Sequence, residues 1–431
     1  DDIGCYGGVA KTPVTDAFAA RGMRYTNSIA PVPKTSPSAA SFVTGLLANR
    51  NGVYRCGNAV SEALTTLPEV LREHGFATGA FISNGNLFPL RKARGLPTGF
   101  DQGFDTFKAI SGEYIRGLGG SCPPMEDPTR NVQPSARCPY LTESALDFVE
   151  KHRDEKFFLW AFHLDPHAPY TPPAEYGEPY ADDPRLLEKT KPIPEQYRSK
   201  NFYVEGQDQS HYYIARHLGE VSHTDHWIGR MLDAVEGLPG RTLYIITSDH
   251  GESFGKDDYW FDHGNFIRAN CVDVPLILAL EGTIPVGKHD ALVANVDLMP
   301  TIFDVLGIDH EHLGLDGRSL RPTFTQEAPW PDRLVPIQVA DGKVWRGVRS
   351  QTHSYQCRFS EESRELQRQE LFDRTVDDVE EHNVFSANPE TVARLHEHMA
   401  DYFSAPDAAP ELSLRDDPQM AEVLEALGYI E

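Results

Sequence analysis

The stretch FFLWAFHLDPH, residues 157–167, joins a hydrophobic run to a polar turn and gives a clear indication of the fold. Residues 157–163 are almost entirely apolar, which is typical of a short strand buried on both faces of a parallel sheet. Helical spacing of apolar residues comes before this run at residues 141–152 and after it at about 210–236, and a second apolar strand follows at 242–247. Strands that alternate with helices predict an α/β fold with a doubly wound, mostly parallel sheet.

Outward from this run, the same patterns predict the rest of the α/β region. We expect helices at residues 12–22, 38–47 and 67–74, and strands at 77–83 and 274–280. Two polar stretches that contain several prolines, about 110–140 and 172–197, are expected to be surface insertions that shape the substrate pocket.

The C-terminal part of the chain has a different pattern. From about residue 333, short strand-like pieces precede a helical tail, at residues 335–339, 343–350, 354–358 and 370–373. Such closely spaced strands predict a small antiparallel sheet. We therefore expect an α/β domain at residues 1–330 and an α+β subdomain at residues 331–431.

The composition indicates a globular protein and narrows the range of partners. The 431 residues can form one large domain and a smaller one, and no apolar run is long enough to span a membrane. The formal net charge of -24 repels polyanions, so we expect no nucleic-acid partner. A small anionic substrate would need local positive charge to overcome this field, and bound metal ions are the obvious source.

The six cysteines include no CxxC pair, which excludes zinc-knuckle and thioredoxin-type motifs. Cys122 and Cys138 lie in the first insertion, where a disulfide in an oxidising compartment and two separate thiols are both open alternatives. The sequence opens at Asp1 without an initiator Met or a signal peptide, and we expect it to be a fragment. Compartment and oligomeric state are therefore not predicted.

Carboxylate and imidazole side chains gather at or near the ends of the predicted strands, where ligands bind in open α/β sheets. The three groups are Asp165 with His167, Asp249 with His250, and Asp262 with His263. Both side-chain types are ligands for Zn²⁺, Mn²⁺ and similar ions. One Asp–His pair is more often a helix cap or a solvated turn, but three pairs placed in this way predict a metal site.

Several segments, in this order along the chain, resemble the sulfatase branch of the alkaline phosphatase superfamily. They are residues 5–7, 12–13, 21–27, 35–45, 247–252, 274–277, 295–301 and 371–373. The resemblance implies an alkaline phosphatase/sulfatase-like fold and a metal-dependent ester hydrolase. It also places Thr35 at the position of the catalytic nucleophile.

The departures from this resemblance concern the chemistry of the nucleophile. A sulfatase uses formylglycine, made from Cys or Ser in a motif with Pro two residues on and Arg four residues on. Here these positions hold Thr35, Pro37 and Ala39, so no formylglycine is expected, and Ser36 is one residue out of register. Two sulfate-binding lysines are also absent, since one falls in the segment 82–85 and the other aligns with His263.

The resemblance to members of the superfamily that transfer phosphoryl groups implies which residues of this chain would bind metal ions. The first metal would be held by Thr35, Asp249, His250 and a first-strand Asp that we expect to precede Asp1. The second would be held by Asp165, His167 and His263. With a single metal, His167 or His263 would act as general acid, and His167 could contact substrate. Asn58 aligns with a substrate-contacting Asn, but a structural turn residue is an equal alternative.

Three functions are therefore open. The first is a hydrolase or phosphotransferase of phosphoric mono- or diesters, in which a metal-activated Thr35 forms a covalent intermediate with a small anionic substrate. The second is a sulfatase without formylglycine, and the third is a non-catalytic binding protein. We expect one or two divalent ions, with Zn²⁺ or Mn²⁺ first and Ca²⁺ or Mg²⁺ as alternatives.

Overall fold

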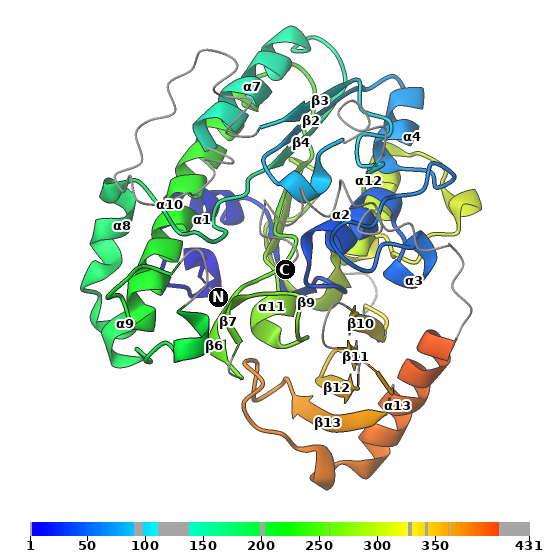
Figure 1. The fold of residues 1–431 in the computed structure, drawn as a ribbon. Coiled ribbons are helices and arrows are strands. Elements are labelled where there is room, and N and C mark those ends of the chain that lie inside the picture. The colour runs from blue at the N-terminus through cyan, green and yellow to red at the C-terminus, as the bar shows by residue number, and fades with distance from the viewer. Residues whose placement is uncertain are drawn as a thin grey trace.

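A computed structural model describes residues 2–89, 98–110, 138–198, 203–257, 259–325, 330–340, 344–360, 362–363 and 365–404, with the side chain of Asp262 left out. Most of the expected insertion at 110–140, with Cys122, lies outside these ranges. Helices cover both faces of the central strands, and a separate small sheet lies below them in the view of Figure 1. This arrangement confirms the predicted α/β fold with a C-terminal antiparallel sheet.

One central sheet is three-stranded and parallel, in the order β3-β2-β4. Its strands are β2 (Ala77–Ile82), β3 (Thr106–Ala109) and β4 (Phe157–Phe162), and β4 confirms the strand predicted from the apolar run. Helix α7 (Cys138–Lys151) packs on this sheet through Phe148, whose ring lies 5.8 Å from that of Phe81. Gly79 permits this approach, because a Cβ there would lie 2.8 Å from the Phe148 ring.

The other central sheet is mixed, in the order β5-β8-β1-β9. Its strands are β5 (Tyr244–Thr247), β8 (Leu276–Ala279), β1 (Met23–Ile29) and β9 (Gly287–Ala294). Only β1 and β9 pair in parallel, since β8 runs antiparallel to both β1 and β5. The hairpin β6 (Ser253–Lys256) and β7 (Tyr259–Asp262) and the short α11 (Ala269–Val272) stand between β5 and β8. No long crossover helix is present there to return the chain in parallel.

The helices form layers on the two faces of these sheets. In Figure 1, α1 (Pro13–Ala19), α10 (Ser210–Val235) and α7 lie on one side, and α2 (Thr35–Thr44), α4 (Leu67–Glu73) and α12 (Leu298–Leu306) on the other. Helix α2 begins at Thr35, three residues before the predicted start at Ser38. Pro37 fits within its first turn, where no helical backbone N–H is required.

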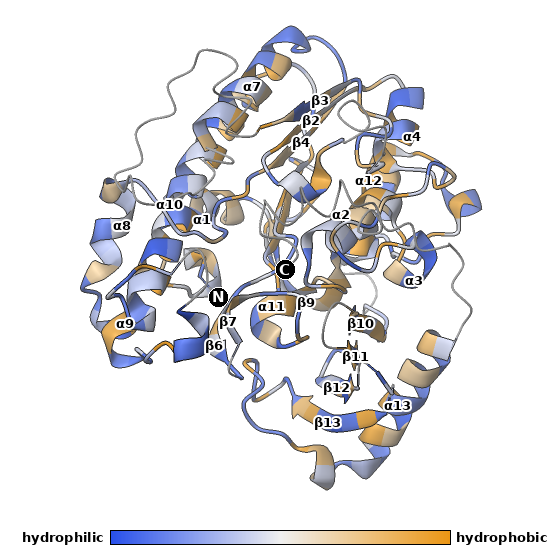
Figure 2. Ribbon diagram, in the orientation of Figure 1, coloured by the Kyte–Doolittle hydropathy of each residue, from blue (hydrophilic) through white to orange (hydrophobic). Residues whose placement is uncertain are grey.

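Shorter helices complete the α/β region. The expected insertion at 172–197 contains α8 (Ala174–Ala181), α9 (Pro184–Glu188) and the 3-10 turn η3 (Glu195–Tyr197), and α3 (Ala48–Asn51) follows α2. In Figure 2, orange hydrophobic residues are concentrated on the buried strands, and blue polar residues lie on the outer faces of the helices. None of the described helices is both long and apolar enough to cross a membrane.

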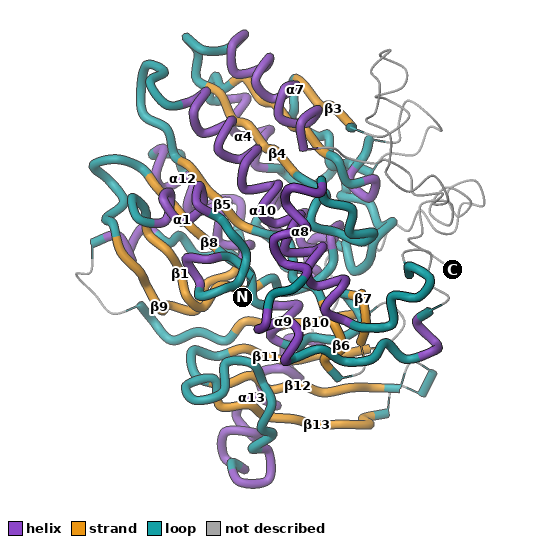
Figure 3. Tube along the Cα trace, turned by 90° about the vertical axis from the view of Figure 1, so that its left-hand side faces the viewer, coloured by secondary structure: helices purple, strands orange, loops and turns teal. Residues whose placement is uncertain are grey.

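The C-terminal strands form an antiparallel sheet in chain order, as predicted (Figure 3). They are β10 (Val335–Val339), β11 (Val344–Arg349), β12 (His353–Phe359) and β13 (Leu366–Asp373), followed by α13 (Pro389–Ser404). Val335 and Ile337 share a hydrophobic core with Ile29 of β1, so the small sheet is continuous with the α/β core. The domain boundary at residue 330 stays a prediction.

The two central sheets leave a space between them. Among the described strands, β4 pairs only with β2 and β5 only with β8, so each presents one free strand edge. A cavity of about 1570 Å³ is lined by both strands, including Trp160 and Ile246, and reaches Thr35. The polar turns at the ends of β4 and β5 line the same cavity.

Candidate active site

Thr35 is the first residue of α2 and is only 2% exposed. Lys34 precedes it in an extended conformation, so the chain enters the helix directly at Thr35. The Thr35 Oγ1 atom lies 3.3 Å from His250 Nε2 and receives a 3.4 Å hydrogen bond from Asn84 Nδ2. The helix N-terminus adds a partial positive charge, which favours an anion beside this hydroxyl.

Asp249 and His250 lie in the loop that follows β5. The residue after them, Gly251, must be a glycine because no side chain fits there. A Cβ on Gly251 would lie 2.1 Å from the Asn270 carbonyl oxygen. His250 Nδ1 lies 2.8 Å from the Gly251 carbonyl, and because a carbonyl only accepts, this nitrogen carries a proton. In the neutral ring, Nε2 therefore has a lone pair directed toward Thr35 and Asp249.

The atoms around His250 Nε2 show whether these residues fit a metal ion. Asp249 Oδ2 lies 3.2 Å from His250 Nε2, and a carboxylate oxygen has no proton to donate. Two lone-pair atoms at this distance require a positive charge between them, either a proton or a metal ion. Since Thr35 Oγ1 is close to the same point, an oxygen–nitrogen–oxygen donor set is present that fits a divalent cation.

Two further histidines lie close to His250: His263 contacts the His250 ring, and His167 contacts the His263 ring. The rings of His250 and His263 stack with centroids 4.0 Å apart, and the rings of His263 and His167 lie 5.1 Å apart. His263 Nδ1 is 3.3 Å from Glu252 Oε2, so it donates to this carboxylate and leaves Nε2 as an acceptor. Burial, together with His250, lowers the pKa of His263 to about 4. The imidazole is therefore neutral at neutral pH.

Glu252 keeps its charge beside these rings. Burial alone would raise the pKa of its carboxyl group, but the charge and hydrogen bond of His263, with a contribution from His167, lower the pKa to about 2. Glu252 lies in a motif quoted for the family resemblance, but the sequence did not single it out as a site residue. It orients His263 and fixes its tautomer.

The structure also reveals two residues that hold the surroundings of Thr35 in place, Asn84 and Ser38. Asn84 donates to Thr35 while its own Oδ1 accepts from the Asn86 backbone. Ser38 Oγ, one turn along α2 from Thr35, donates to the Asp249 carbonyl at 2.7 Å. Asn84 stands in the segment where the family's lysine is missing, which was the sequence signal for it. Ala39, 3% exposed, places only a methyl group at the arginine position of the motif.

Two predicted site residues have other surroundings. Asp165 Oδ2 accepts from the Cys138 thiol at 3.2 Å, and the ligand atoms of Asp165, His167 and His263 form no group within 4.8 Å among the described residues. The predicted second-metal set is therefore not assembled. Asn58 Oδ1 accepts from two backbone N–H groups, of Tyr54 and Arg55, each at 3.0 Å. This favours the structural alternative for Asn58.

The fold and the comparisons with known proteins together define the class, which is a hydrolase of sulfuric or phosphoric esters. The sulfatase family model matches residues 1–308. The chain therefore belongs to the sulfatase family. Enzymes of this family use divalent metal ions.

The chain is similar in sequence to two sulfatases and in fold to a phosphonate monoester hydrolase. The N-acetylglucosamine-6-O-sulfatase of Bacteroides thetaiotaomicron is 24% identical over 400 residues, covering 76% of this chain and 69% of its own length. The choline-sulfatase of Rhizobium meliloti is 25% identical over 342 residues, covering 72% and 66%. The phosphonate monoester hydrolase of Agrobacterium radiobacter has a similar fold, with a TM-score of 0.72 at 19% identity and coverage of 94% and 93%.

Proposed function

We propose that this protein hydrolyses phosphoric esters through Thr35 as a covalent nucleophile. The observation that carries the proposal is the position of Thr35 Oγ1, buried at the start of α2 within 3.3 Å of His250 Nε2 and 3.4 Å of Asn84 Nδ2. A hydroxyl at this point can approach a phosphorus atom that is held by the helix N-terminus.

Asp249, His250 and Thr35 would hold one divalent ion, for which Zn²⁺ or Mn²⁺ is our first choice. When bound, this ion would lower the pKa of the Thr35 hydroxyl and offset the charge of the ester.

The chain's own residues then have defined roles. The Thr35 hydroxyl loses its proton to solvent, and its oxygen forms a bond to phosphorus while the bond from phosphorus to the leaving oxygen breaks. Asn84 donates to the Thr35 oxygen and keeps it in place. Of the two histidines predicted as general acids, His167 is the candidate for carrying a proton to the leaving oxygen, because His263 is neutral and offers an acceptor nitrogen. Water then attacks the phosphothreonine, which releases phosphate and restores Thr35. His167 would also contact substrate in this arrangement.

The choice of phosphate over sulfate rests on the groups around Thr35. Threonine cannot supply the aldehyde hydrate of formylglycine, and Ala39 and His263 replace the motif's arginine and a lysine. The phosphonate monoester hydrolase of similar fold is consistent with phosphorus chemistry on this scaffold. A sulfuric ester hydrolase is the second candidate, because the relatives of highest sequence similarity reported above are sulfatases.

The test compares an aryl phosphate, an aryl phosphodiester and an aryl sulfate in the presence of Zn²⁺ or Mn²⁺. We expect faster turnover of one phosphoric ester, loss of activity in Thr35→Ala and partial activity in Thr35→Ser, which keeps a hydroxyl. Ser36→Ala is the matched control, since Ser36 is the next residue, is also buried and bonds the Asn86 carbonyl instead. Faster turnover of the sulfate, or full activity of Thr35→Ala, would contradict the proposal.

A further inference from the structure

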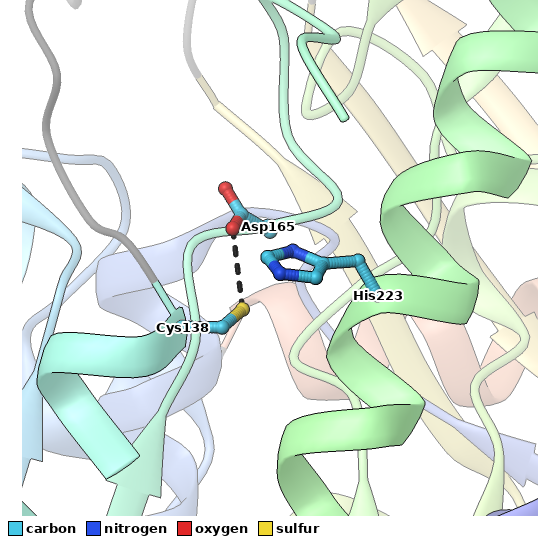
Figure 4. Close-up of side chains that lie close together, drawn as sticks. All are labelled: Cys138, Asp165 and His223. Atoms are coloured by element: carbon cyan, nitrogen blue, oxygen red, sulfur yellow. Dashed lines mark hydrogen bonds between the residues drawn. The ribbon is translucent and has the colours of Figure 1, made fainter. Parts of the chain in front are cut away.

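A second group of metal-ligand side chains consists of Cys138, Asp165 and His223 (Figure 4). In the described part of the chain, it is the one set of three His, Cys, Asp or Glu residues whose ligand atoms all lie within 4.8 Å of one another. In the view of Figure 4, the three side chains point toward one another. The cluster has no role in the ester hydrolysis proposed above.

Three separate elements hold these side chains in position. Cys138 is the first residue of α7, Asp165 lies in the loop after β4, and His223 is on α10. Cys138 is 2% exposed and His223 is 7% exposed. The Cys138 thiol donates to Asp165 Oδ2 at 3.2 Å, so the two groups are already in contact. A ligand bound here would join α7, α10 and the end of β4.

His163 gives a second, independent indication of a ligand. It directly follows β4, and both of its ring nitrogens are buried without a hydrogen-bond partner among the described residues. A buried polar atom without a hydrogen-bond partner destabilises the fold, so an imidazole with neither nitrogen satisfied requires an explanation. Burial, together with nearby His223, lowers the pKa of His163 to about 4, so its ring is neutral and carries an available lone pair.

The charges around the thiol favour a bound cation over a reactive cysteine. Burial raises the pKa of Cys138 well above its usual value, and the negative charges of Asp165 and Glu220 raise it further. A thiol in such surroundings stays protonated and is a poor nucleophile. A divalent ion would reverse this balance, because it neutralises the carboxylate and stabilises the thiolate.

We propose that Cys138, Asp165 and His223 bind a structural Zn²⁺ ion, and that His163 turns toward them to supply the fourth ligand. A sulfur, an oxygen and two nitrogens are a ligand set that Zn²⁺ accepts in tetrahedral geometry, in which ligand atoms lie about 3.5 Å apart. The ligand atoms of Cys138, Asp165 and His223 lie within 4.8 Å of one another and need only small side-chain movements to reach that geometry, whereas the ring of His163 stands outside this group and must turn toward it. On binding, the sulfur–metal bond forms as the thiol proton leaves to solvent.

Trp227 provides an internal test of this arrangement. Its indole N–H donates to His223 Nε2 at 2.9 Å, which identifies this nitrogen as carrying a lone pair. The bond orients the His223 ring, so removing the indole N–H in Trp227→Phe should change the affinity for metal.

The experiment uses Co²⁺ as a probe for Zn²⁺ in the whole, chelator-treated protein. We expect Co²⁺ to give the charge-transfer absorption of a thiolate ligand, and Zn²⁺ to remove it by competition. The proposed catalytic site contains no cysteine among its described ligands, so this absorption reports only the second site. Asp249→Asn, which disables the catalytic site, should leave the absorption unchanged, and Cys5→Ser is the matched thiol control.

Cys138→Ser should abolish the absorption. His223→Gln and His163→Gln should each weaken Co²⁺ binding by roughly 10–100-fold or more, since loss of a residue that only supports a metal ligand already has an effect of this size. If Cys138→Ser does not fold, the two His→Gln variants decide the matter. Absence of the absorption in the unmodified protein, or its persistence at full strength in Cys138→Ser or in both His variants, would overturn the proposal. Loss of esterase activity in Asp249→Asn alone would bear only on the proposed function.

Discussion

Ser38 Oγ donates a 2.7 Å hydrogen bond to the backbone carbonyl of Asp249, which ties the first turn of α2 to the loop after β5. Ser38 stands three residues from Thr35, on the same side of the helix. The bond therefore fixes the Thr35 hydroxyl relative to the Asp249 carboxylate. Asn295 Nδ2 donates a hydrogen bond to the same Ser38 oxygen and also holds this side chain in position.

Replacing Ser38 with Ala should loosen this connection. We expect metal affinity or kcat to fall by about 10–100-fold, as for other groups that orient metal ligands. The free energy of unfolding should fall by about 1 kcal/mol, the net value of a typical hydrogen bond. Ser41→Ala is the control on the same helix, because its buried hydroxyl has no hydrogen-bond partner among the described residues. Equal kinetic losses in both variants would show that Ser38 has no special role.

Asn84 should matter for rate more than for binding. Asn84→Ala removes the donor to Thr35 Oγ1, and we expect kcat on an aryl phosphate to fall by roughly 10²-fold. Asn84→Asp should lose a similar amount, although it keeps the oxygen that accepts from the Asn86 backbone. Steady-state kinetics on both variants separate the two contacts, and wild-type kcat in Asn84→Asp would rule out the donor role.

Removal of the metal should abolish hydrolysis reversibly. We expect a chelator to stop turnover of the aryl phosphate and Zn²⁺ or Mn²⁺ to restore it. His250→Ala should not be restored, because it removes the nitrogen that faces both Asp249 and Thr35. Activity that survives exhaustive chelation, confirmed by metal analysis, would exclude a metal-activated threonine.

Arg349 should be central to stability. It is 0% exposed on β11 and forms ion pairs with Asp273, which lies before β8, at 2.9 Å and with Glu380 at 3.1 Å. Arg349→Leu removes one of the two arginines that pair with these carboxylates, since Arg374 also contacts both, and we expect a loss of about 3 kcal/mol in urea unfolding, the lower end for breaking a buried ion pair. Since Asp273 and Arg349 lie on opposite sides of residue 330, we also expect a single transition. Two well-separated transitions in the unmodified protein would instead support an independently folded C-terminal subdomain.

The sequence predicted the elements whose hydrophobic pattern is strong. The apolar run of β4, the long helix α10 and the four C-terminal strands were all identified within a few residues. Strands β1 and β9 were missed because each carries polar residues along half its length, such as Arg24 and Asn27 in β1. Their burial depends on neighbours that are distant in sequence, and no local pattern records that.

The candidate site was predictable where ligands lie next to each other in sequence. Asp249 and His250 form such a pair, and Thr35 Oγ1 lies 3.3 Å from His250 Nε2, while the role of this set as metal ligands stays a prediction. The partners of Asp165 could not be predicted, since Cys138 and His223 come from two helices that meet only in the folded chain. Asn84 was likewise visible only as the place of a missing lysine.

The central claim is that Thr35 becomes phosphorylated during turnover, and a trapped intermediate tests it most directly. The protein, loaded with Zn²⁺ or Mn²⁺, is mixed with an aryl phosphate, quenched in acid, digested and examined by mass spectrometry. We predict one phosphoryl group on the peptide that contains Thr35, located on that residue by fragmentation and absent when Thr35 is replaced by Ala. Rapid turnover without any modification of Thr35, or a phosphoryl group found on Ser36 instead, would contradict the account.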